Sequence, residues 1–75
     1  MKAYTFEVYK PACPDRPDQT TFARVHTGSL EQNRDSLNPS MSFVREFYAE
    51  TDVDAINKAK KVSRVYFAKF EGLQT

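Results

Sequence analysis

The stretch that decides the fold runs from Ser42 to Leu73 and reads SFVREFYAETDVDAINKAKKVSRVYFAKFEGL. Its first eight residues, 42–49, alternate between two sides, which is the pattern of a β-strand. One side carries Phe43, Phe47 and Ala49, and the other carries Val44 and Tyr48. A second β-rich run follows at 64–70, so the stretch predicts a strand, a helix and a strand.

The helix is expected to begin after Thr51, whose hydroxyl can accept a hydrogen bond from the free N–H groups of the first turn. Asp54 stands where a capping box would have Glu. Apolar residues then recur at helical spacing and predict one buried stripe. The stripe consists of Val53, Ile56, Ala59 and Val62, with Ala55 beside it.

Two further strands are expected before this stretch, at Lys2–Lys10 and Thr20–Thr27. In the first, Tyr4, Phe6 and Val8 face one way. Three prolines in the segment 11–18 end that strand, because proline cannot donate to a ladder, and they predict a stiff loop. A proline-marked loop between neighbouring strands indicates a wide antiparallel hairpin.

The segment 28–40 is expected to hold a short helix or a long mobile loop. Gly28 ends the second strand, and Ser29 with Gln32 three positions later matches a capping box. A helix over 30–37 would end before Pro39. Only Leu30 and Leu37 would anchor it, so the loop remains an alternative.

These elements predict one small α+β domain over residues 1–75, in the order β-β-(short α)-β-α-β. We expect a four-stranded, mainly antiparallel sheet with the main helix on one face. The strands that flank this helix can pair in either sense, because a helical crossover permits the parallel option.

One helix covers one face of such a sheet, so aromatic side chains should remain on the other face. Exposed aromatic patches mark contact surfaces. The alternative is that the segment 28–40 folds over that face. The residues concerned, of which we expect several on the uncovered face, are Tyr9, Phe22, Tyr48, Tyr66 and Phe70.

Composition and motifs argue against an enzyme. The formal charge is +1, which favours neither a nucleic-acid nor a membrane partner, and no apolar run suggests a leader or a membrane span, so we expect a cytoplasmic protein. The single Cys13 cannot form an internal disulfide, and nothing orients it towards His26 as a nucleophile and base. The single histidine does not provide the several ligands of a usual metal site, and the two glycines do not form a phosphate-binding loop. Asp52 and Asp54 are expected to interact with the N-terminus of the helix rather than to act as a catalytic pair. We therefore expect no catalytic residue, metal or cofactor.

The run Phe43–Thr51, followed by Asp54-Ala55 and Ala59, resembles small phage-encoded host-takeover proteins, in particular the podophage inhibitor of bacterial RNA polymerase. The segment His26–Leu30 is loosely similar to another part of that inhibitor. The resemblance covers about 30 of the 75 residues, and this chain adds an N-terminal hairpin strand and the proline loop. It implies a phage-encoded accessory protein that binds a host protein. In the inhibitor, arginines of the last strand contact the polymerase, and here Arg64 and Lys69 lie in the expected last strand.

Three hypotheses follow. The first is a non-enzymatic inhibitor or modulator of a host complex, either RNA polymerase or a defence system such as a CRISPR effector, in the bacterial cytoplasm. The second is a module that binds single-stranded nucleic acid through a basic, aromatic sheet face. The third is a self-associating domain that forms a homodimer. The predicted partner-binding residues are Arg45, Tyr48, Lys58, Lys61, Arg64, Tyr66, Lys69 and Phe70.

Overall fold

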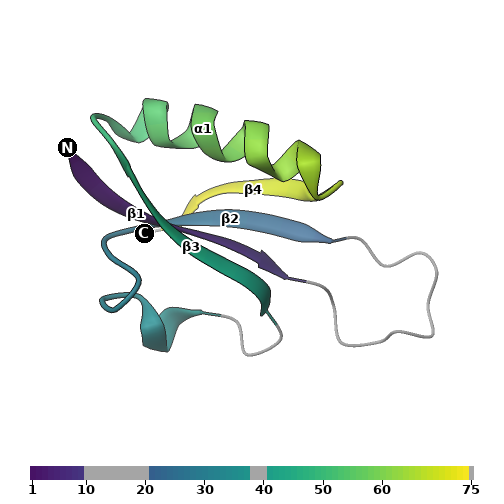
Figure 1. Ribbon diagram of the computed structural model, residues 1–75, viewed down its shortest axis with the longest axis horizontal. Coiled ribbons are helices and arrows are strands. Elements are labelled where there is room, and N and C mark those ends of the chain that lie inside the picture. The colour runs from purple at the N-terminus through teal and green to yellow at the C-terminus, as the bar shows by residue number, and fades with distance from the viewer. Residues whose placement is uncertain (10–20, 38–40, 75) are drawn as a thin grey trace.

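The computed structural model describes residues 1–9, 21–37 and 41–74 and shows an α+β sandwich of one sheet and one helix (Figure 1). The strands are β1 (Lys2–Tyr9), β2 (Phe22–Thr27), β3 (Met41–Ala49) and β4 (Lys69–Gln74), and the helix is α1 (Asp52–Val65). A single 3₁₀ turn, η1 (Arg34–Ser36), lies between β2 and β3. The predicted fold class is confirmed. The predicted proline loop and Cys13 lie outside the described residues.

The sheet has the order β3-β1-β2-β4. β1 pairs antiparallel with both β2 and β3, and β2 pairs parallel with β4. The two strands that flank α1 are therefore the two edges of the sheet, and they run in the same direction without pairing. The sequence left their relative sense open, and the crossover through α1 settles it as parallel and non-adjacent.

The core lies between the sheet and α1. From the central strands it takes Tyr4, Phe6, Val8, Ala23 and Val25, all at most 3% exposed. Half-buried side chains that pack against it come from both edge strands, among them Phe43, Phe47, Phe70 and Leu73. Tyr4, Phe6 and Val8, which were predicted to share one side of β1, face the helix.

The buried stripe of α1 differs from the predicted one. Val53 is 67% exposed and Val62 40% exposed, whereas the buried positions are Ala55, Ala59 and Ser63, spaced by four residues. The sheet contributes large rings, so only small helical side chains fit against it. The Ser63 hydroxyl is satisfied within the helix, where it donates to the Ala59 carbonyl at 2.7 Å.

The helix begins as predicted and ends later than predicted. The Thr51 hydroxyl accepts from the Asp54 N–H at 3.1 Å. The predicted strand at 64–70 is wrong over 64–68, because α1 continues to Val65 and β4 begins only at Lys69. The strand preference of β-branched and aromatic residues depends on their context, and here Ser63 is buried as part of the last helical turn.

The segment after β2 folds over the sheet face opposite α1 (Figure 1). The predicted capping box forms in both directions: the Ser29 N–H donates to Gln32 Oε1 at 2.8 Å, and the Gln32 N–H donates to Ser29 Oγ at 3.2 Å. The capping box begins a turn that is followed by η1, and the predicted helix over 30–37 does not form. The Asn33 amide donates to the carbonyls of Thr27 and Ser29, both at 2.9 Å, which ties the segment to β2.

Of the five aromatic residues considered for the sheet face away from α1, three lie there and two do not. Tyr9, Phe22 and Tyr48 pair in the register that turns them away from α1, as expected. Tyr66, in contrast, is the C-cap of α1, and Phe70 packs against the core.

Candidate protein-binding groove

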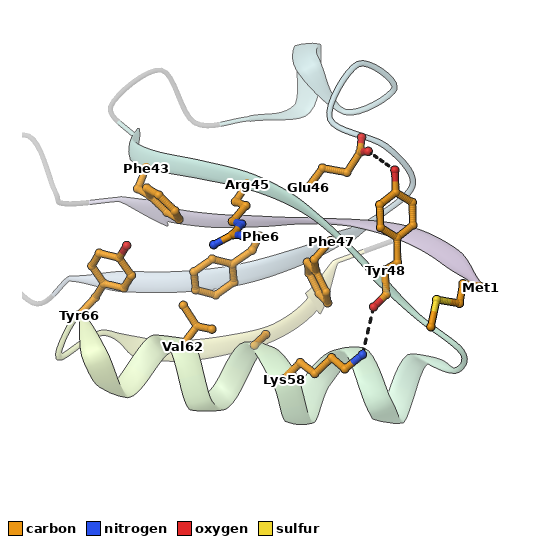
Figure 2. Close-up of a pocket in the computed structure, with 11 residues that line it drawn as sticks. Met1, Phe6, Phe43, Arg45, Glu46, Phe47, Tyr48, Lys58, Val62 and Tyr66 are labelled. Carbon is orange, nitrogen blue, oxygen red and sulfur yellow. Dashed lines mark hydrogen bonds between the residues drawn. The ribbon is translucent and has the colours of Figure 1, made fainter.

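A groove of about 550 Å³ opens between α1 and edge strand β3 (Figure 2). It exists because α1 packs mainly on β4 and β2, so the helix-facing side of β3 is only partly covered. The residues that line it are Met1, Phe6, Phe43, Arg45, Glu46, Phe47, Tyr48, Lys58, Ala59, Val62 and Tyr66.

The floor and walls of the groove are aromatic and aliphatic. Phe6 lies 6.4 Å from Phe43 between ring centres, and Phe43 lies 5.3 Å from Tyr66, which brings β3 and the end of α1 together. Phe47 stacks on Tyr4 at 5.7 Å. Val62 points from α1 towards Phe6 (Figure 2). An accessible apolar surface of this kind favours contact with another molecule.

Arg45 places a cation in the middle of this apolar surface. It pairs with Phe6 across the sheet, so its side chain lies on the helix side of β3, between those of Phe43 and Phe47 (Figure 2). Residue Arg45 is exposed. Within 1–9, 21–37 and 41–74, no carboxylate forms an ion pair with it. The guanidinium therefore keeps its donors available for an acceptor from outside the chain.

Lys58 adds a second positive charge at the rim. Its ammonium group donates to the Tyr48 carbonyl at 3.1 Å and lies 3.4 Å from the Asp54 carboxylate. The bond to Tyr48 joins α1 to β3 at one end of the groove (Figure 2).

The acidic side chain of β3 points the other way. Figure 2 shows Glu46 and Tyr48 on the far side of the strand from Arg45. The Tyr48 hydroxyl donates to Glu46 Oε2 at 2.6 Å, and the Leu30 N–H donates to Glu46 Oε1 at 2.9 Å. These bonds, the Tyr48 one foremost, lower the pKa of Glu46. Glu46 is thus engaged with the covering segment and does not neutralise Arg45.

The structure brings together half of the predicted partner-binding residues. Arg45, Lys58, Tyr66 and Tyr48 line the groove, although the Tyr48 side chain turns to the other face. The other four are dispersed: Lys61 and Arg64 are exposed on α1, Lys69 is exposed on β4, and Phe70 is half-buried against the core. The basic and aromatic residues therefore do not form the single sheet face that the nucleic-acid hypothesis assumed.

Sequence reasoning missed the aromatic lining of Phe6, Phe43 and Phe47. The signal was present, because Arg45 has the same parity as Phe43 and Phe47 and must share their side of a strand. Reading Arg45 with its two neighbours would have predicted a cation flanked by rings.

The opposite sheet face holds an ionic cluster around Glu7, which is buried. Glu7 Oε1 accepts from Arg24 Nε at 2.5 Å and lies 3.0 Å from His26 Nε2. The Glu7 carboxylate raises the pKa of Arg24. The Tyr9 ring lies over the Arg24 guanidinium at 5.0 Å. His26 thus has a structural partner, and Cys13, which nothing in the sequence orients towards it, lies outside the described residues.

Comparison with protein-family models, with curated proteins and with solved structures gives no match for this chain. In the part of the chain that the structure describes, no helix is long and apolar enough to cross a membrane. In the same part, no group of three or more His, Cys, Asp or Glu side chains could hold a metal ion.

Proposed function

We propose that this protein is a small non-enzymatic inhibitor or modulator that binds a protein complex of a bacterial host through the groove between α1 and β3. The observation that carries the proposal is Arg45, a cation that has no ion-pair partner among the described residues and lies between Phe43 and Phe47 on an accessible apolar surface. Arginine and aromatic residues are the groups most enriched where proteins bind one another tightly.

The charge of the groove indicates the kind of partner. Arg45 and Lys58 are the cations of its lining, and the carboxylate of Glu46 is engaged on the other side of the strand. The favoured partner surface is therefore apolar with an acidic group. The resemblance of 43–59 to phage host-takeover proteins suggests either RNA polymerase or a defence complex as the partner.

The test is affinity capture from nuclease-treated bacterial lysate with three forms of the tagged protein. The wild type and Lys60→Glu, which changes an exposed lysine outside the groove, should retain one stoichiometric protein complex. Arg45→Glu should lose it. Capture of the same complex by all three forms, or of none by the wild type, would contradict the proposal. Material that is captured only from a parallel lysate without nuclease treatment would instead favour nucleic-acid binding.

A further inference from the structure

The groove lies beside β3, which is an edge strand of the sheet. The Ala3 carbonyl accepts from the Gly28 N–H at 2.9 Å, so the backbone of Ala3 is directed towards β2 and away from β3. Ala3 and Tyr48 are therefore a pair without mutual hydrogen bonds, and the backbone groups of Tyr48 point outwards. The Tyr48 carbonyl accepts from Lys58, in agreement with this orientation.

The register of β1 and β3 is uninterrupted from Lys2–Ala49 to Val8–Phe43. Because the orientation repeats every second residue, Glu46 and Val44 also turn their N–H and C=O groups to the outer edge. Among the described residues, no strand pairs with this edge. The backbone groups that an added strand needs are thus those of Val44 and Glu46 and the Tyr48 N–H, since the Tyr48 carbonyl already accepts from Lys58.

We infer that an extended segment of the partner protein adds to β3 as a fifth strand and places an acidic side chain opposite Arg45. This inference rests on the proposed function and specifies how the groove binds. An added strand lies about 4.8 Å beyond β3, and every second side chain of it points to the α1 side. On that side β3 presents Phe43, Arg45 and Phe47 in succession.

The complementary segment is defined by this succession. Opposite residues of paired strands contact one another, so the segment should read apolar, any residue, Asp or Glu, any residue, apolar. The acidic side chain forms an ion pair with Arg45 that the neighbouring rings shield from water, which strengthens it relative to an exposed pair. The two apolar side chains cover Phe43 and Phe47.

A second copy of this chain is not expected to pair with β3 through its own β3. The antiparallel register that pairs Phe43 with Phe47 of a second copy also sets the two Arg45 side chains face to face. Like charges directly opposite each other destabilise a strand pair. An inward-pointing charge on an edge strand is in fact a common protection against such self-pairing.

The first experiment selects from a displayed library of random decapeptides on the wild-type protein, with Arg45→Glu as the counter-target. We expect enrichment of peptides with an acidic residue flanked by apolar residues two positions away on each side. These peptides should bind Arg45→Glu at least tenfold more weakly and Lys60→Glu as well as the wild type. No enrichment, or enrichment of peptides without the acidic residue, would overturn the inference.

A second measurement follows the backbone itself. When an enriched peptide binds, amide hydrogen exchange at Val44, Glu46 and Tyr48 should slow, while Phe43, Arg45 and Phe47, whose amides face β1, should change little. Exchange that slows only in α1 would place the peptide on the helix and reject strand addition. The proposed function would survive that result if capture of the host complex still depends on Arg45, so the two failures are distinguishable.

Discussion

Phe67 adopts a backbone conformation that glycine usually takes. Its φ is +53°, its side chain is 92% exposed, and it follows the C-cap of α1. The Phe67 N–H donates to the Arg64 carbonyl at 3.1 Å and the Ala68 N–H to the Ser63 carbonyl at 3.0 Å, which is the Schellman pattern of a helix end. A side chain in this conformation costs about 1–2 kcal/mol, and the exposed ring recovers little by packing.

We therefore expect Phe67→Gly to raise the free energy of unfolding by about 1 kcal/mol, because glycine takes positive φ without strain. In a domain of this size the melting temperature should rise by about 4–8 °C. Phe67→Ala is the matched control, since it removes the ring and keeps the strained φ. Equal stability of the two variants in thermal or urea unfolding would show that strain at this residue is not the cause.

Tyr4 links β1 to the first turn of α1. It is fully buried, and its hydroxyl donates to Asp52 Oδ1 at 2.6 Å. This hydrogen bond, with burial second, raises the pKa of Tyr4 to about 12. The phenol is thus held neutral in the folded protein at a pH where it ionises in the unfolded chain.

A raised pKa contributes stability that is complete below pH 10 and is lost as pH rises towards 12. The wild type should therefore exceed Tyr4→Phe in free energy of unfolding by a constant amount up to about pH 9.5. Above that the difference should shrink. Denaturant titrations at several pH values from 8 to 11 would measure it, and a difference that stays constant throughout would contradict the assignment of the shift to Tyr4.

At the scale of elements, the Asn33 amide is one of the groups that hold the segment 28–37 in place. Asn33 donates to the Thr27 and Ser29 carbonyls and, at 3.4 Å, to Thr5 Oγ1. Asn33→Ala should lower the free energy of unfolding by about 1–2 kcal/mol, since each bond contributes about 0.5–1.5 kcal/mol. Asp35→Ala, an exposed change in the same segment, should have little effect. Urea unfolding of both variants would check this, and equal losses would show that Asn33 does not hold the segment.

The order and type of the elements could be predicted from the sequence because each carries a local signal. Thr51 marks the helix start by its hydroxyl, and the alternation of Tyr4, Phe6 and Val8 marks β1 and its core side. The limits of α1 and β4 could not, since residues 64–67 suit a strand locally, whereas in the fold Ser63 is buried and the N–H groups of Phe67 and Ala68 close the helix end. The strand order likewise depends on which edges meet in space, and no local pattern encodes it.

Several residues of the candidate site could be predicted from the sequence, but the position of the groove could not. Arg45, Lys58 and Tyr66 were among the predicted partner-binding residues, and they line one groove. The groove itself results from the position of α1 over β2 and β4, which the sequence does not specify. For the same reason Phe70 and Lys69 were grouped with these residues, although the parallel pairing of β4 with β2 places them at the opposite edge.

At the scale of the whole molecule, Arg45 also affects how the protein associates with itself. Arg45→Leu would leave β3 with an uninterrupted apolar row of Phe43, Leu and Phe47 beside a free backbone edge, and such edges pair with one another. We expect this variant to form dimers or larger species at concentrations where the wild type does not. Lys60→Leu adds the same side chain outside the groove and should not. Sedimentation velocity would show this, and identical behaviour of both variants would mean that β3 is not an available edge.

The most direct test of the binding surface is amide hydrogen exchange of the whole protein with and without its captured host complex. We expect slowed exchange at the outward-facing amides of β3, those of Val44, Glu46 and Tyr48, and in the groove-lining part of α1 at 58–65. Exchange in β2 and in the segment 28–37, which lie away from the groove, should be unchanged. Protection confined to residues 22–37 would place the partner on the opposite face of the sheet and contradict the assignment of function to the groove.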